Sequence, residues 1–338
     1  MAATDPILIP TPSVPRRRRH PIAAFVARRV AAGIGLLAII SVLVFGATNV
    51  LPGDVAAAVL GRQATPESVA GLRQELGLDR PLVPRYLDWV GGVLHGDLGR
   101  SLAGTQEPVW TLIRDPLVNT LTLAGLTILV LIPLSLLLGI AAGVRVTRPL
   151  DQGISAVTLA ITAVPEFVIG ALLVLVFAVS LGILPAVSLI PPGTNPLADP
   201  SLVVLPVATL VLAGLAYMVR IVRAGVADVV LSDFVEMARL NGVRERRVIT
   251  RYAVRNALAP TVQALAATIQ WLLGGVFVVE TLFSYPGIGR ALIVAVTVRD
   301  FPVIEAAGLL IAAFYIALNI VADIAIVLLI PKLRTAQL

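Results

Sequence analysis

Long apolar runs without charged residues dominate the chain and predict its architecture. A helix needs about 20 residues to cross about 30 Å of hydrocarbon. The segments that meet or nearly meet this length are 31–50, 119–144, 154–184, 202–219, 260–279 and 303–330. Their hydrophobicity is continuous rather than alternating, which favours helices over the strands of a barrel. We therefore expect an all-α polytopic membrane protein with six transmembrane helices.

The distribution of arginine predicts which side of the membrane each loop faces. Most basic residues fall in the tail 1–30, the short loop around Arg145 and Arg148, the loop 220–257 and the tail 331–338. Arginine and lysine accumulate in cytoplasmic segments. Both termini and the loop 220–257 are therefore expected in the cytoplasm, with 119–330 as a core domain of five spans.

The segment 51–118 then lies outside the membrane, and it is too long to be a simple connector. Thr65, Pro66 and Glu67 are typical of a helix start, with an N-cap, a proline in the first turn and an early acid. A second apolar helix face can be drawn through Leu87 and Leu94, with aromatic neighbours Tyr86 and Trp89 suited to the lipid headgroup level. We expect both helices to lie on the outer surface or to cap the pore entrance.

Composition agrees with the membrane assignment and excludes several kinds of chemistry. Of 338 residues, 58% are hydrophobic and 14% charged, against about a quarter charged in soluble domains. The absence of cysteine excludes disulfides and thiolate sites. Lys332 is the one lysine, so the chain lacks the lysine of a phosphate-binding P-loop. His20 and His95 lie on opposite sides of the predicted membrane, and no catalytic or metal site is expected.

The arginine-rich start, Arg16 to Arg19 followed by an apolar run, has alternative interpretations. A secretory signal peptide would have a shorter apolar core and a small-residue cleavage site, so an uncleaved first span is favoured. A nucleic-acid partner is not expected, because arginines beside a span ordinarily orient the chain and touch anionic lipid.

Polar residues inside the apolar spans are costly and need an explanation. We expect Glu166, Glu280, Asn319 and Asp323 at the translocation pathway or at contacts between helices. A proton or ion relay through Asp323 is the functional alternative. A structural contact, with Asn319 one turn away, is favoured because no second acid or histidine aligns with it. Glu166 follows Pro165, where a break in the helix is expected, and whether it lines a pathway stays open.

The cytoplasmic loop 220–257 is rich in charge in a chain that is otherwise poor in it. Residues 233–240 read as a short helix stopped by Asn241 and Gly242, a pair that tolerates the left-handed conformation at a helix end. A second helix is predicted to start near Arg244. Such a loop is either a solvated or lipid-surface face, or a rigid handle that a soluble partner grips.

This loop resembles the E-A-A-x-x-x-G segment of the permease subunits of ABC importers. Glu236, Ala238 and Gly242 stand in the matching places, and Met237 stands where alanine is common. Further segments resemble the oligopeptide, dipeptide and nickel branch of that family, namely Leu51–Asp54, Leu76–Asp79, Gly96–Ser101, Glu280–Gly289 and the pair Asn319 and Asp323. The chain departs from the general motif at Arg255, where an isoleucine is usual, and its proline follows later.

The resemblance implies a type I ABC importer permease fold and a set of partners. These are a second permease, most simply a different chain in a heterodimer, two ABC ATPases or one fused pair, an extracytoplasmic solute-binding protein, and membrane lipid. ATP and magnesium would be bound by the ATPases, with no cofactor and no catalysis in this chain. Short peptides are the expected cargo, with nickel chelates, glutathione-like thiols and oligosaccharides as alternatives. The expected location is the cytoplasmic membrane of a prokaryote.

The same resemblance assigns candidate site residues. The contact with the ATPase would be made by Asp233, Glu236, Met237, Ala238, Arg239 and Gly242. Gly287 and Gly289 would allow a tight turn in the outer loop near the pathway mouth.

Three other classes of protein fit the sequence less well. A secondary carrier would need ion-coupling residues at mid-membrane and often an inverted repeat, which the sequence does not show. A membrane-embedded enzyme would need clustered catalytic side chains. A passive anchor would not explain a structured, capped cytoplasmic loop.

Overall fold

The computed structural model describes an all-helical protein. It describes residues 21–50, 55–60, 64–75, 77–103, 106–253, 267–268, 271–272 and 274–329. Within these residues the extended structure consists of one isolated bridge, between Arg100 and Pro108. The predicted tails lie largely or wholly outside the described residues, as do half of the predicted fifth span and all of Leu51–Asp54. The prediction of an all-α polytopic membrane protein is confirmed.

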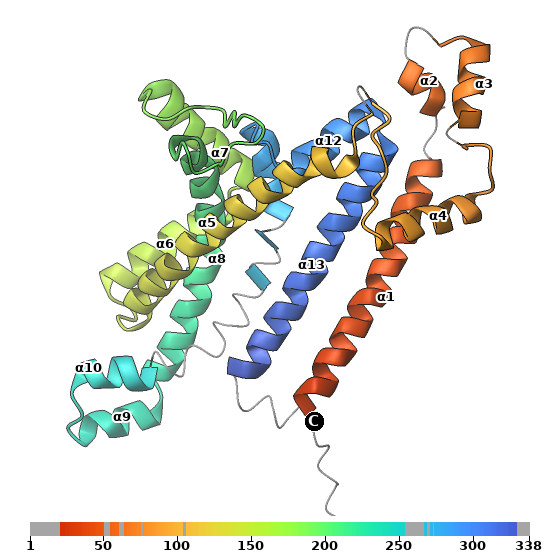
Figure 1. Cartoon of the computed structure of the whole chain (residues 1–338). Coiled ribbons are helices and arrows are strands. Elements are labelled where there is room, and N and C mark those ends of the chain that lie inside the picture. Colours follow the sequence, from red (N-terminus) through yellow and green to blue (C-terminus); the bar gives the residue numbers. More distant parts are fainter. Residues whose placement is uncertain are drawn as a thin grey trace, which may run out of the picture.

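Among the described residues, four helices are long and apolar enough to cross a membrane (Figure 1). They are α1 (Pro21–Val50), α5 (Val109–Gly143), α8 (Ser201–Val230) and α13 (Phe301–Leu329). They correspond to the first, second, fourth and sixth predicted spans. Both α1 and α5 begin earlier than predicted because charged residues, such as Arg114 and Asp115, continue the helix beyond the apolar run. Long basic side chains can reach water from such positions.

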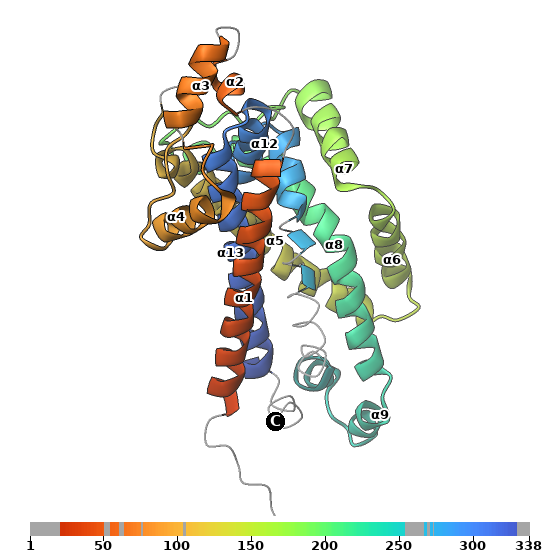
Figure 2. The same ribbon diagram turned by 90° about the vertical axis from the view of Figure 1, so that its right-hand side faces the viewer.

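The third predicted span is broken rather than continuous. It consists of α6 (Pro149–Thr162), α7 (Glu166–Leu173) and the π-helix η2 (Val174–Ser180), and the two parts are bent by 103°. Figure 2 shows α6 and α7 stacked beside α8 with the break between them. The break falls at Pro165, which has no N–H to donate and disfavours helical geometry at the residue before it.

A short helix that the sequence did not predict lies before the last span. Residues 274–282 are helical and belong to the fifth span. After a turn, α12 (Ile288–Val298) follows at the outer end of the bundle. Its 11 residues are apolar but too few to cross the membrane, so a length criterion misses it.

The outer and cytoplasmic ends of the molecule carry different short helices. The helices α2 (Val55–Leu60), α3 (Pro66–Glu75) and α4 (Leu82–Leu94) lie at the end that holds α12. The opposite end holds α9 (Asp233–Leu240), α10 (Glu245–Arg247) and the π-helix η3 (Val248–Ala253). The start of α1 and the end of α13 lie on the side of α9, in agreement with the topology predicted from the arginines.

The predicted outer helices are confirmed, with one correction. Thr65 caps α3, since its Oγ1 accepts a hydrogen bond from the Ser68 N–H at 3.2 Å. The rings of Tyr86 and Trp89 in α4 pack on Phe45 of α1, with centroid distances of 5.5 and 5.7 Å. The two aromatic residues therefore hold α4 against the first span, whereas the sequence suggested that they face the headgroups.

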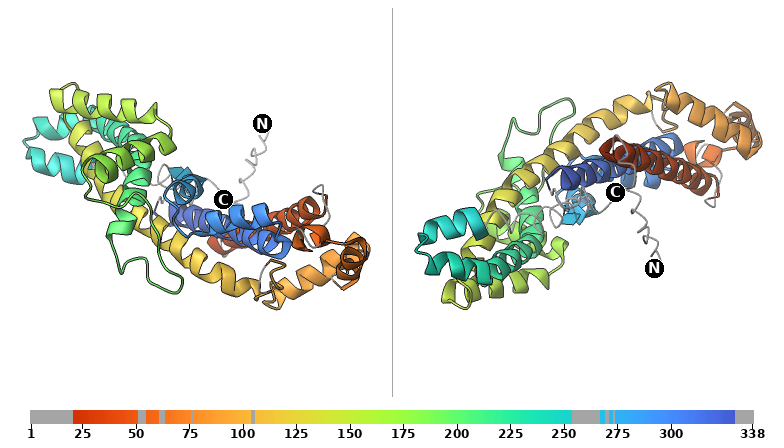
Figure 3. Two further views of the ribbon diagram at one scale, coloured as in Figure 1. Left: turned by 90° about the horizontal axis from the view of Figure 1, so that it is seen from above. Right: turned by 90° about the horizontal axis from the view of Figure 1, so that it is seen from below.

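Packing of α5 against α8 forms the centre of the bundle. Seen from above, α5 runs from the half that contains α1 and α13 to the half that contains α6 to α10 (Figure 3). Buried side chains of both helices form one hydrophobic cluster, including Leu123, Leu131, Leu210, Leu215 and Val219. On the other flank, α1 packs along α13, where Gly33 allows the close approach of Ile316.

Candidate functional site

The short helix α9 extends from the cytoplasmic end of α8 and is rigidly terminated. Gly242 follows it with φ of +75°. The Gly242 N–H donates to the Arg239 carbonyl at 2.9 Å, and the Val243 N–H donates to the Ala238 carbonyl at 3.1 Å. These two bonds form a Schellman motif, which satisfies the last carbonyls of a helix and favours glycine at this position. The predicted helix and its Asn-Gly stop are confirmed in geometry.

An ion pair closes the turn between α9 and α10. The Arg239 guanidinium donates to both carboxylate oxygens of Glu245, at 3.1 and 2.9 Å, and also to the Val230 carbonyl at 3.4 Å. The hydrogen bonds and charge of Arg239 lower the pKa of Glu245, and those of Glu245 raise the pKa of Arg239. Arg239, a candidate for an ATPase contact, is thus engaged within its own loop.

The exposed side of α9 carries an apolar ridge that sequence reasoning missed in part. Val235 points inward and is fully buried. Beside it, four apolar side chains at a spacing of three residues are exposed to between 48% and 76%: Leu231, Phe234, Met237 and Leu240. We call these four residues the α9 ridge. The i, i+3 spacing of these residues in the sequence is the signal that indicates such a ridge.

The other residues that were predicted to contact the ATPase lie around this ridge. Asp233 and Glu236 are exposed in the first turn of α9, where acids are favoured by the helix dipole. Ala238 is half-buried, and Gly242 is exposed. The structure therefore places Asp233, Glu236, Met237 and Gly242 at the surface, whereas Ala238 faces partly towards the rest of the loop.

A buried ion pair, also missed by sequence reasoning, ties α6 to the lower part of α8. Asp151 is 2% exposed. Arg223 donates from Nε and Nη2 to its two carboxylate oxygens at 2.6 and 2.7 Å, and the Thr147 N–H donates to the same carboxylate at 2.9 Å. Bidentate geometry with a further donor makes this pair a defined link between the two helices.

Two glycines bring α5 and α8 together at the same level. Gly139 and Gly143 are four residues apart in α5, the small-xxx-small spacing that lets membrane helices approach closely. A Cβ on Gly139 would lie 2.5 Å from the Cβ of Val222, and one on Gly143 would lie 2.7 Å from the Cβ of Val226. The cytoplasmic ends of α5, α6 and α8 are thus connected directly above α9.

Glu280 lies at a contact between helices rather than in open space. It is fully buried. It accepts hydrogen bonds from the Thr120 hydroxyl of α5 and from the Gly289 N–H of α12, the latter at 2.8 Å. Thr120 in turn accepts from the Ile288 N–H at 2.9 Å. This network joins the fifth span, α5 and α12.

The glycines near Glu280 are required for space and not for a left-handed turn. Gly287 has a φ of −97°, which any residue can adopt. A Cβ on Gly287 would collide with the Glu280 carboxylate, and one on Gly289 would collide with Phe277. A tight turn does precede α12, with the Gly287 N–H donating to the Tyr285 carbonyl at 2.8 Å, and close packing on Glu280 is a second reason for glycine at these positions.

The polar residues of α13 contact neighbouring groups. Asp323 forms an ion pair with Arg29 of α1 at 3.1 Å. The Asn319 amide donates to the Tyr315 carbonyl of its own helix at 2.9 Å. A buried contact that the sequence did not reveal joins the same two helices, since the Thr48 hydroxyl donates to Glu305 at 2.7 Å. The Asp323–Arg29 pair is a contact between helices of the kind favoured for Asp323, whereas Asn319 bonds within its own helix.

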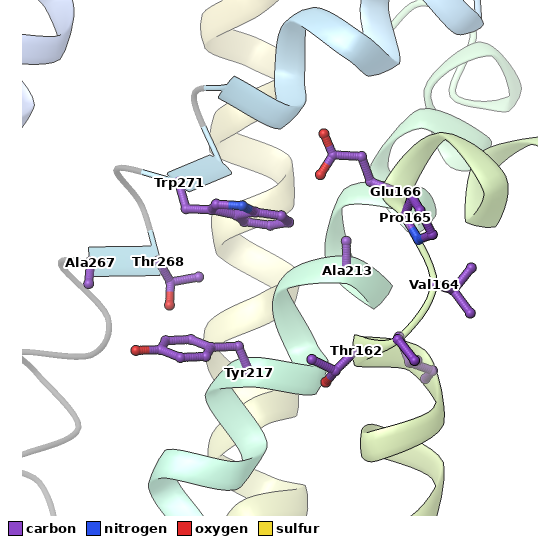
Figure 4. A pocket seen from close by; sticks show the side chains of 11 residues that line it. Thr162, Val164, Pro165, Glu166, Ala213, Tyr217, Ala267, Thr268 and Trp271 are labelled. Carbon is purple, nitrogen blue, oxygen red and sulfur yellow. The ribbon is translucent and has the colours of Figure 1, made fainter.

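Glu166 lies in a cavity at the break between α6 and α7 (Figure 4). The cavity has a volume of about 540 Å³. Its lining comes from the break itself, from α8 and from the fifth span: Ile161, Thr162, Ala163, Val164, Pro165, Glu166, Ala213, Tyr217, Ala267, Thr268 and Trp271. The sequence indicated the break and left open the surroundings of Glu166.

Comparisons with known proteins place these features in a family. Residues 135–335 match the family described as binding-protein-dependent transport system inner membrane component. Residues 22–124 match the N-terminal segment of such membrane components. A solved structure described as an amino acid ABC transporter with histidines has a TM-score of 0.46 and 21% identity, covering 64% of this chain and 92% of that chain.

Curated relatives align over nearly their whole length. A putative peptide transport system permease protein of Brucella abortus is 34% identical over 313 residues, covering 93% of this chain and 99% of the relative. The glutathione transport system permease protein GsiC of Salmonella typhimurium is 36% identical over 312 residues, covering 92% and 98%.

The match to the family model extends over more than half of the chain, and the relatives align from end to end. The apolar helices agree with a multi-pass protein of the bacterial plasma membrane, as the family description requires. Importers of this kind work with ATPases and binding proteins. The chain belongs to the binding-protein-dependent transport system inner membrane components and is the permease component of an ABC importer.

Proposed function

We propose that this chain forms half of the translocation pathway of an importer for short peptides and that the α9 ridge docks in a groove of an ABC ATPase. Peptide and glutathione are the cargoes in the names of its relatives, and both are small molecules with amide bonds. A second, similar permease would supply the other half, and each of two ATPase domains would grip one permease.

The single observation that supports this docking is the exposed α9 ridge. Phe234, Met237 and Leu240 stand on the outer side of a helix that is itself firmly held by Val235, by its capped end and by the Arg239–Glu245 pair. An amphipathic helix that presents apolar side chains at such spacing is the form recognised by a hydrophobic groove. Burying one such side chain fully contributes about 1.5 to 3 kcal/mol.

The connection from α9 into the membrane supports the transmission of movement. Since α9 follows α8 directly, and Asp151–Arg223 and the two glycines of α5 connect α8 to its neighbours, a displacement of α9 would move α5, α6 and α8 together. Approach of the two ATPases on binding ATP would therefore reorient these helices as a rigid unit. The chain has no P-loop lysine, so the energy comes from the partner.

Assembly with the ATPase tests the proposal. The double variant Met237→Ser/Leu240→Ser is coexpressed with its partner subunits, and ATPase that copurifies with the permease is quantified. We expect at least a tenfold loss, because two buried side chains of this kind contribute more than 1.4 kcal/mol together. The matched control is Leu94→Ser, an equally exposed leucine in α4 at the other end. Normal ATPase recovery with the double variant would contradict the docking surface.

Cargo is tested in vesicles that contain the whole complex and its binding protein. Uptake of a labelled dipeptide and of labelled glutathione is measured with and without ATP. ATP-dependent uptake of the dipeptide is the expected result. Transport that needs no ATPase would favour a secondary carrier instead.

A further inference from the structure

We infer that the cavity around Glu166 binds the positively charged amino end of the transported solute. This inference rests on the proposed function and adds a substrate group and a site to it. It depends on the depth of the cavity, the environment of the Glu166 carboxylate and the aromatic side chains that share its lining.

The cavity lies within the membrane-spanning segments, between their middle and their cytoplasmic ends. Ala213 and Tyr217 line it from α8, and both fall near the middle of this helix of 30 residues. The break between Thr162 and Glu166 lines it from the broken third span. Its volume of 540 Å³ falls within the range of about 300 to 1,000 Å³ typical of small-molecule sites. A small solute on its way through the membrane can therefore be accommodated.

Glu166 is the one ionisable acid or base among the described residues that line this cavity other than the phenol of Tyr217. In the described part of the chain, no side chain or backbone donor bonds its carboxylate. The other buried acids of the bundle differ, since Glu280, Glu305 and Asp151 each accept hydrogen bonds from neighbouring residues. A carboxylate in a membrane span is costly without a partner.

Glu166 lies in the first turn of α7, where the helix dipole partly stabilises its negative charge. The dipole does not replace a counterion. A helix N-terminus favours a negative charge, so an acid at this place has a structural reason to be there. That reason does not account for the room left beside the carboxylate or for the side chains that surround it. A cation supplied by the solute would provide the missing partner.

Two aromatic side chains in the lining suit the same cation. Figure 4 shows the Trp271 ring reaching across the cavity towards the side of Glu166, with the Tyr217 ring below it. Trp271 is 47% exposed and Tyr217 is 48% exposed, so both rings offer free surface. Aromatic faces attract ammonium groups, and tryptophan does so most strongly.

The remaining lining limits the class of ligand. Val164 and Ala213 contribute small apolar surfaces that suit short aliphatic side chains. A single carboxylate does not supply the several oxygen ligands that a magnesium or calcium ion takes from a protein. A primary ammonium group attached to a small apolar body, such as the first residue of a peptide, matches these features together.

The test compares two probes on the complete importer without its binding protein. The purified complex, in lipid nanodiscs, is titrated calorimetrically with Ala-Ala and with N-acetyl-Ala-Ala, which lacks the ammonium group. We expect the acetylated peptide to bind at least tenfold more weakly, since a hydrogen bond to a charged group contributes about 1.5 to 3 kcal/mol. Glu166→Gln should abolish this preference, and Glu166→Asp should keep part of it.

A merely structural role for Glu166 would change the binding of both probes alike. Glu67→Gln, which removes an acid from the exposed helix α3, is the control and should keep the preference. Equal binding of both probes, binding of neither, or a preference retained by Glu166→Gln would overturn the inference. Stimulation of ATP hydrolysis by the binding protein, measured in the same unsubstituted complex, tells whether the proposed function stands when this inference fails.

Discussion

Asp151 and Arg223 lie 72 residues apart in the sequence and share a bidentate ion pair at the cytoplasmic ends of α6 and α8. The Asp151 side chain is almost fully buried, and about a third of the Arg223 side chain is exposed. Through this pair the broken third span is attached to the helix that leads into α9. The attachment lies on the path along which the ATPase would act.

Loss of Arg223 should weaken both stability and coupling. Arg223→Ala leaves the Asp151 carboxylate buried with the Thr147 N–H and the Ser155 hydroxyl as its remaining donors. Removing hydrogen-bond partners from a buried polar group costs about 1 to 3 kcal/mol. The thermal midpoint of the purified complex should fall, and ATP-driven uptake should fall with it. Arg220→Ala, an exposed arginine of the same helix, should leave both unchanged.

Close packing of α5 on α8 predicts a strong effect of a small substitution. Gly139→Val places a side chain where the Cβ of Val222 already lies. Forced overpacking typically costs about 1 to 3 kcal/mol. We expect a lower yield of assembled complex and a lower thermal midpoint. Gly125→Val is the matched control on the same helix, because a Cβ there meets nothing within 4 Å. Similar behaviour of the two variants would contradict the packing argument.

Gly242 offers a test of backbone conformation without steric interference. A Cβ on this residue would have nothing within 4 Å, but its φ of +75° disfavours L residues. Gly242→Val should therefore keep membrane insertion and lose transport, because a β-branched residue resists this conformation. Gly242→Asn should transport far better, since asparagine tolerates the left-handed region. Insertion is followed by the amount of protein in the membrane and transport by uptake. Normal uptake by Gly242→Val would refute the assignment.

The Arg239–Glu245 pair predicts a pH dependence of the α9 turn. Because the folded pKa of Glu245 is lowered, the pair stabilises the turn above the ordinary glutamate pKa of about 4.3. This contribution is lost as the pH falls through the folded pKa, and it is small because both side chains are partly exposed. The chain has no cysteine, so Asn241→Cys provides a unique site in it for a fluorescent label.

Anisotropy of that label should fall as the pH is lowered below about 4.3, the range in which the Glu245 carboxylate is protonated. Adding Glu245→Gln should give the lower anisotropy already at neutral pH and remove the dependence. A pH response that survives this substitution would assign the effect to another group.

The apolar runs were sufficient to predict the spans but not their breaks and ends. Continuous hydrophobicity located α1, α5, α8 and α13, since lipid imposes the same length on each of them. Pro165 indicated a break, whereas the angle of 103° depends on how α6 and α7 pack on α8. The helix α12 was not predicted, because its 11 residues are too few to be recognised as a membrane span.

Features of the candidate site could be predicted where the local sequence alone decides the backbone conformation, as at the end of α9. Asn241 and Gly242 determine the end of α9 through backbone preferences, and these can be seen in a single sequence. The contacts of Asp151 with Arg223 and of Glu280 with Thr120 join residues 72 and 160 positions apart. Such pairs depend on the arrangement of helices in space, which one sequence without relatives does not contain.

The Glu280 network also constrains the order in which the protein can mature. Its donors belong to α5, which is synthesised early, and to α12, which is synthesised near the end. Chains fold from the N-terminus as they leave the ribosome. Thr120 is therefore synthesised well before Glu280. The network is complete only after residues 288–290 have been synthesised as well. The outer half of this permease reaches its final form only when translation is almost finished.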